Sequence, residues 1–133
     1  MNARETPLKY DLIVETLLER VPTFRDSGLV RETLSGDDYH LDYVVFGRFA
    51  TFLNERIPRV PLSDPTIQAS FKLLNDMGNS GDQRLENLAA VGTFEVLTDS
   101  PNSIRAARQL LYGRAIDLFE EMIRIWGVEV KDP

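Results

Sequence analysis

Apolar residues recur along the chain at intervals of three and four positions, and this spacing predicts α-helices. A short helix is also expected near 29–34, before Ser35 and Gly36 interrupt the chain. The main expected helices cover about 7–21, 39–57, 64–77, 82–98 and 101–127.

One stretch is open to a second interpretation. Tyr43-Val44-Val45-Phe46 groups the β-branched and aromatic residues that are typical of a strand. The helical spacing continues through the whole of 39–57, so the longer window favours a helix.

Four helix starts are marked by residue type. Thr6-Pro7, Asp64-Pro65 and Ser100-Pro101 each place a side-chain oxygen at the N-cap and proline at the first helical position. Ser80 and Gln83 have the spacing of a capping box, after Gly78 ends the preceding helix.

The last two expected helices differ in character. The helix over 82–98 is apolar on more than one side and carries Ala89, Ala90 and Gly92, so it should be central and closely packed. The stretch 101–127 predicts one continuous helix of about 40 Å.

The pattern therefore predicts an all-α chain with a single domain over 1–133, built as an irregular antiparallel bundle of five or six helices. A short HEAT-like helical stack is the alternative.

The composition limits which kinds of functional site this chain can form. The chain has 21 acidic and 15 basic residues, a net charge of -6, no cysteine and one histidine. These features exclude disulfides, thiolate metal sites and a cysteine nucleophile, and they argue against nucleic-acid binding. With no signal-peptide pattern and no apolar run of about 18 residues, we expect a cytoplasmic protein that does not enter a membrane.

The densest polar cluster is Asp37-Asp38-Tyr39-His40-Leu41-Asp42. Asp38, His40 and Asp42 would bind a metal only if the segment were extended, since residues two apart diverge on a helix. We favour the interpretation that Asp37 or Asp38 caps the helix that begins near Tyr39.

The segment from Asp76 to Asp82 is rich in Asp, Asn and Gly, as calcium loops are. It lacks their ligand spacing, and Asn87 stands where the bidentate glutamate belongs. A turn between helices is the favoured interpretation.

The charged residues of 101–127 include Asp117 and Glu121, with Arg114 and Arg124 three positions away. This spacing favours a solvated, salt-bridged helix face over an acidic catalytic pair.

Two residues in apolar surroundings leave alternatives open. Glu95 is expected to pair with Arg105 or Arg108, and a functional carboxylate is the alternative. Trp126 is either part of the core or an exposed anchor for a partner. No nucleophile elbow, phosphate loop or metalloprotease helix is present, so neither an enzyme nor a cofactor is expected.

Three segments together resemble a known family: the stretches 43–53, 71–75 and 86–97. Over about 40–98 they are similar to small bacterial helical proteins associated with immunity proteins, the antidotes stored beside secreted antibacterial toxins. The resemblance implies a protein that binds one cognate toxin in the producer's cytoplasm and occludes its active site without catalysis.

A negative net charge suits a basic toxin domain, because complementary charge speeds encounter. The alternative is a helical regulatory or scaffold module that binds a partner protein or peptide. The residues expected to face the partner are acidic: Asp37, Asp38, Asp42, Asp76 and Asp82.

Overall fold

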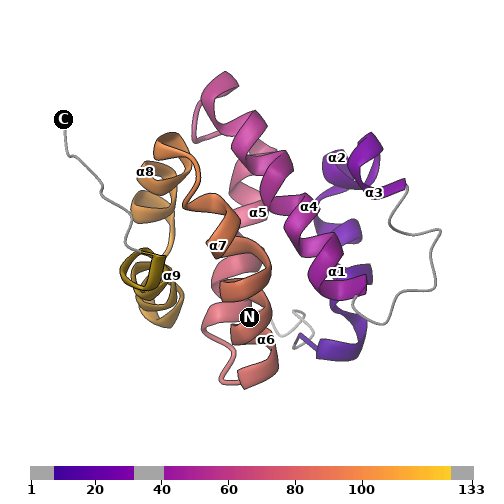
Figure 1. Cartoon of the computed structure of the whole chain (residues 1–133). Helices are drawn as coiled ribbons and strands as arrows, with labels where there is room; N and C mark the ends of the chain where they lie inside the picture. The colour runs from indigo at the N-terminus through magenta and orange to yellow at the C-terminus, as the bar shows by residue number, and fades with distance from the viewer. Residues whose placement is uncertain (1–7, 32–40, 127–133) are drawn as a thin grey trace, which may run out of the picture.

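The computed structural model describes residues 8–31 and 41–126, and within these ranges the chain forms helices and no strand (Figure 1). Among the described residues, two short 3-10 helices, η1 and η3, and one π-helix, η4, accompany the α-helices. In chain order the elements are η1 Tyr10–Leu12, α1 Ile13–Arg20, α2 Pro22–Arg25, α3 Gly28–Arg31, α4 Leu41–Arg56, η3 Ile57–Arg59, α5 Pro65–Gly78, α6 Gln83–Asn87, η4 Leu88–Phe94, α7 Glu95–Leu97, α8 Pro101–Leu110 and α9 Gly113–Trp126.

The expected all-α bundle is confirmed, although it is divided into more helical segments than five or six. α4 and α5 match the helices expected over 39–57 and 64–77, so the strand interpretation of 43–46 is wrong. The helix expected over 7–21 is present as η1 followed by α1. α3 covers the beginning of the helix expected near 29–34, whose remainder lies outside the described residues.

The segment from α6 through η4 to α7 runs through the middle of the bundle, between α4 on one side and α9 on the other (Figure 1). Its expected central position is confirmed. The core around it is built on phenylalanine, and the Phe94 and Phe119 rings meet edge to face at 5.6 Å. The fully buried phenylalanines are Phe24, Phe46, Phe49, Phe71, Phe94 and Phe119.

Small residues bring this central segment against α4. A Cβ added to Gly92 would lie 3.2 Å from the Cβ of Phe46, tighter than most Cβ contacts, so glycine favours the close approach of the two backbones here. The Thr93 hydroxyl donates to the Phe46 carbonyl oxygen at 3.1 Å. The π-helical winding of η4 was not predicted by the spacing, since π-segments share the apolar character of α-helices.

The single long helix expected over 101–127 is wrong. The chain leaves the helix at Leu111 and Tyr112, and α9 begins at Gly113 with φ at +62°. Side chains from α5 fill the break: Asn75 Nδ2 donates to the Leu110 carbonyl at 3.0 Å, and Asn75 Oδ1 accepts from the Tyr112 amide at 3.0 Å. The backbone groups freed by the break are thus satisfied from another helix.

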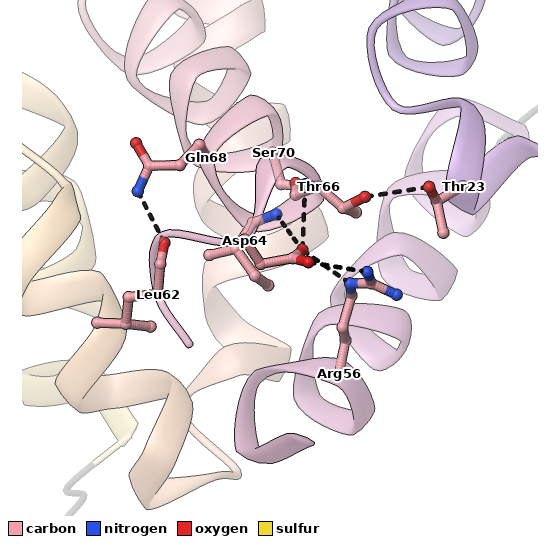
Figure 2. Close-up of polar contacts among 8 residues, drawn as sticks. Thr23, Arg56, Leu62, Asp64, Thr66, Gln68 and Ser70 are labelled. Atoms are coloured by element: carbon pink, nitrogen blue, oxygen red, sulfur yellow. Dashed lines mark hydrogen bonds and ion pairs between the residues drawn. The ribbon is translucent and has the colours of Figure 1, made fainter. Parts of the chain in front are cut away.

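Two of the expected N-caps are confirmed. Asp64 accepts from the amides of Thr66 and Ile67, and its carboxylate also binds Arg56 of α4 through two bonds of 3.1 Å (Figure 2). Ser100 accepts from the Ser103 amide at 3.4 Å and caps α8. The contact between Asp64 and Arg56 ties the first turn of α5 to the end of α4.

The capping box expected at Ser80 is wrong by two residues. Asp82 is the N-cap of α6 and accepts from the Arg84 amide at 2.9 Å, while the Ser80 hydroxyl donates back to the Met77 carbonyl. A carboxylate nearer the helix start is the better acceptor and also complements the helix dipole. The Thr6-Pro7 start lies outside the described residues.

Candidate partner-binding surface

Of the five acidic residues expected to face a partner, Asp37 and Asp38 lie outside the described residues. His40 does too, so neither the expected cap nor the metal alternative is described. Asp42 is half-buried in the first turn of α4. Its carboxylate accepts from the Tyr10 hydroxyl and, at 2.9 Å, from the Tyr43 amide, so it is occupied within the fold.

Tyr10 connects the Asp42 carboxylate to a second group, the guanidinium of Arg84. Burial, followed by the hydrogen bond to Asp42, raises the pKa of Tyr10 above its ordinary value. The Arg84 guanidinium lies over the ring, 4.8 Å from its centroid, and a nitrogen of Arg84 is 3.6 Å from the Asp82 carboxylate. Asp42 and Asp82 are therefore joined through Tyr10 and Arg84.

Asp76 is also engaged. Its carboxylate lies 2.7 Å from Nη1 of Arg20, on α1, and 3.4 Å from Nζ of Lys72, one turn earlier on α5. With Asp82 capping α6, the segment between them is a helix-to-helix turn, as expected. The partner-facing role expected for Asp42, Asp76 and Asp82 thus gains no support from their geometry, because each carboxylate already binds internal donors.

Exposed carboxylates are found elsewhere, on η1 and α1. Asp11, Glu15 and Glu19 are exposed, and within the described ranges none of them forms an ion pair. Glu15 and Glu19 lie four residues apart on one face of α1, opposite the buried Ile13 and Leu17, and Asp11 lies four residues before Glu15 in η1. We call these three residues the acidic stripe. Sequence reasoning missed it, although the spacing was readable.

The charged residues of the last helix form a solvated face, but with different pairs from those expected. Asp117 and Glu121 are exposed, while Arg114 pairs with Glu86 of α6 at 3.4 Å. Arg108 binds Glu120 through two bonds of 2.8 and 2.9 Å, which holds the pKa of Glu120 below its ordinary value. The pairs cross between helices because the break at 111–112 turns α9 back against α8 and α6.

The ion pair expected between Glu95 and Arg105 or Arg108 is not formed. Arg105 binds Asn102 in its own helix and Arg108 binds Glu120. Glu95 is half-buried instead, at the edge of a surface hollow of about 310 Å³. The hollow is lined by Glu95, Val96, Thr98, Asp99 and Trp126.

Trp126 belongs to the surface. Its side chain is 56% exposed and that of Ile125 is 63% exposed, whereas Phe119 on the same helix is fully buried. Trp126 is therefore not part of the core, and its role as an anchor for a partner stays a prediction. An exposed tryptophan beside two carboxylates can contact both apolar and cationic groups of another molecule.

The described part of the chain offers little else that points to a chemical activity. Among those residues, no group of three or more His, Cys, Asp or Glu side chains could hold a metal ion. Their helices are also all too short or too polar to cross a bilayer.

Comparison with known proteins gives a family. No curated protein and no solved structure matches the chain. A family model described as a domain of unknown function, DUF7674, matches residues 14–127, from the second residue of α1 through α9. The chain therefore belongs to the DUF7674 family.

Proposed function

We propose that this protein is an immunity protein, which binds a basic toxin domain in the producer's cytoplasm and occludes its active site without catalysis. The observation that carries the proposal is the acidic stripe, in which Asp11, Glu15 and Glu19 stay exposed and unpaired among the described residues. The resemblance of 40–98 to immunity proteins adds to it.

The stripe suits a basic partner for an electrostatic reason. Asp11 and Glu19 are eight steps apart along the chain, about 12 Å at an α-helical rise, which is close to the screening length at physiological salt. The nearest helical arginine, Arg20, is already bound to Asp76 and neutralises none of them. Unneutralised like charges at this spacing create a local negative potential that attracts a positively charged partner and accelerates association.

The position of the stripe also suits docking. α1 is anchored by Ile13 and Leu17, which are fully buried, so the stripe is held on a rigid element. A rigid surface binds with a smaller loss of conformational entropy than a mobile one. The proposal therefore moves the partner contacts from Asp42, Asp76 and Asp82 to the stripe.

A second candidate function, a helical regulatory or scaffold module, is favoured by the exposed Ile125 and Trp126. Large apolar side chains next to each other at a helix end serve as anchors in protein interfaces. Such a module would bind its partner mainly through apolar burial, and its affinity would depend weakly on salt.

The test is recovery of the partner from the host with the tagged full chain, at low and at high salt, followed by mass spectrometry. We expect one stoichiometric basic protein whose recovery falls with salt and whose toxicity on expression is suppressed by this chain. The stripe variant D11N/E15Q/E19Q should associate about tenfold more slowly.

The matched control is E55Q/D117N/E121Q, which removes three exposed carboxylates from other helices. Equal slowing by the two triple variants would mean that only net charge matters and that the stripe is not the interface. Recovery of several partners that are insensitive to salt would favour the scaffold function, and a partner that is not toxic would contradict the immunity proposal.

A further inference from the structure

The hollow between α7 and the end of α9 combines features that the acidic stripe lacks. Two acidic residues, Glu95 and Asp99, and the aromatic Trp126 line it together with Val96 and Thr98. Its volume of about 310 Å³ leaves room for a single long side chain. It lies on different helices from the acidic stripe, so it forms a separate surface.

The polar groups that remain open in the hollow are acceptors. The Thr98 hydroxyl donates to the Glu95 carbonyl oxygen at 2.6 Å, and the Val96 carbonyl accepts from Asn54 Nδ2 at 3.1 Å. The carboxylates of Glu95 and Asp99 form no ion pair within the described ranges. A ligand for this hollow must therefore supply donors and positive charge.

Glu95 strengthens the requirement that the ligand be positively charged. The residue is half-buried, and a carboxylate in such a position is stabilised when a counter-ion joins it. The arginines of the neighbouring helix α8 that could have supplied one, Arg105 and Arg108, are bound to Asn102 and Glu120. None of the ion pairs among the described residues involves Glu95, so a cation of a partner protein can join it.

Trp126 selects among cations. An exposed indole face attracts a cation, and the planar guanidinium of arginine can stack on it while its N–H groups fork toward carboxylates. The compact ammonium of lysine presents three donors from one point and does not stack. Two carboxylates beside an indole therefore match a guanidinium better than an ammonium.

We propose that this hollow binds an arginine side chain of a partner protein, with the guanidinium stacked on Trp126 and donating to Glu95 and Asp99. The proposal deepens the proposed function, on which it rests for the basic character of the partner. It adds a defined subsite and a residue type that the partner must present there.

The test uses the full chain and short peptides, because Trp126 is the single tryptophan of the sequence and its fluorescence reports directly on the hollow. The probe is the blocked peptide Gly-Arg-Gly, with Gly-citrulline-Gly as a neutral isostere and Gly-Lys-Gly as the ammonium counterpart, all at constant ionic strength. We expect saturable quenching by the arginine peptide, with a Kd on the order of 10 mM, and weaker binding of the other two peptides.

Variants assign the contacts. E95Q and D99N should each weaken arginine binding by about threefold, while E121Q, an exposed carboxylate elsewhere on α9, should leave it unchanged. The indole N–H signal in NMR spectra provides a second readout, and circular dichroism shows whether each variant is folded. If E95Q fails to fold, the D99N variant alone still tests whether a carboxylate of the hollow contributes to arginine binding.

The proposal is overturned if citrulline or lysine peptides bind as well as the arginine peptide, or if neither carboxylate variant weakens binding. Its outcome is distinguishable from that of the immunity proposal. D11N/E15Q/E19Q should keep the peptide affinity of the wild type, and peptide binding can be present even where no toxin is recovered.

Discussion

Oδ1 of Asn79 occupies the place that a side chain at position 113 would need: a Cβ built on Gly113 would lie 2.4 Å from it. The same oxygen accepts from the Arg114 amide at 2.8 Å, and Asn79 Nδ2 donates to the Tyr112 carbonyl at 3.1 Å. The break between α8 and α9 is therefore held by Asn79, the C-cap residue of α5, and it favours glycine at position 113.

Gly113→Ala should destabilise the fold by about 2–3 kcal/mol. The substitution combines a strained positive φ, which costs about 1–2 kcal/mol, with the contact against Asn79. The measurement is the free energy of unfolding from urea titration.

Gly81→Ala is the control for this prediction. Gly81 has φ at +79°, but nothing lies within 4 Å of a Cβ built there, so it isolates the backbone strain. Gly113→Ala should therefore cost more than Gly81→Ala, and the excess should disappear in an Asn79→Ala background. Equal costs in the wild-type background would show that Asn79 yields freely.

Gly78→Ala should be among the most destabilising single-methyl additions in the chain, by about 3 kcal/mol. A Cβ at this position would lie 2.6 Å from the Cβ and 2.7 Å from the Cα of Ala115, where α5 crosses α9. Backbone atoms cannot move aside as a flexible side chain can. A melting temperature close to that of the wild type would contradict the close crossing of these two helices.

Asp64 should make the fold sensitive to acid. The hydrogen bond from Arg56 is the main cause that lowers its pKa, and the Ile67 and Thr66 amides add to it against the effect of burial. A carboxyl whose pKa is lowered on folding stabilises the protein above its unfolded pKa of about 3.9, and that contribution is lost as the pH falls through the folded value.

Asp64→Asn keeps the N-cap acceptor but removes the charge, so it should destabilise the protein at pH 7 by about 1 kcal/mol. The difference in unfolding free energy from the wild type should shrink below about pH 4. Asp117→Asn, at an exposed site, is the control and should leave the pH profile unchanged. A constant difference between D64N and the wild type down to pH 2 would contradict the assignment.

Tyr10 should ionise at a higher pH than the ordinary value for tyrosine, about 10, in an alkaline absorbance or NMR titration. Burial is the largest cause of its raised pKa, and Asp42 is the next. Asp42→Asn should therefore move the Tyr10 midpoint toward the ordinary value for tyrosine without restoring it fully. Because the neutral phenol is favoured by folding, the stability contributed by Tyr10 is complete below its unfolded pKa of about 10 and is lost at higher pH. An unchanged midpoint in D42N would contradict the contact.

The predicted helices that proved correct are those with local signals. Ile67, Phe71, Leu74 and Met77 lie on the buried face of α5, as their spacing predicts, and Asp64 caps that helix. Both signals act within a few residues, so no knowledge of the remaining chain is needed.

The long helix expected over 101–127 failed because its apolar spacing continues across the break. Leu111 and Ala115 are both buried and four residues apart, so the pattern does not register the turn between them. Gly113 was a weak signal, since an isolated glycine costs a helix only about 1 kcal/mol. Asn75 and Asn79 made the break favourable, and they lie more than 30 residues earlier.

The candidate binding surface shows the same division between what local spacing predicts and what contacts between helices determine. The excess of acidic residues was evident from composition, but which carboxylates are free depends on donors from other helices. Arg20 reaches Asp76 across 56 positions and Tyr10 reaches Asp42 across 32, whereas Glu15 meets no such donor among the described residues. The partner-facing residues could therefore not be chosen from sequence spacing alone.

The sequence by itself determined which segments are helical, which of their faces are apolar and where α5 and α8 begin, because periodicity and capping are interactions between near neighbours. Only the tertiary structure decided where the last helix is interrupted, which acidic groups remain exposed and that Trp126 lies at the surface beside Glu95. Those outcomes depend on side chains that reach across from other helices, and packing brings such residues together without any trace in local spacing.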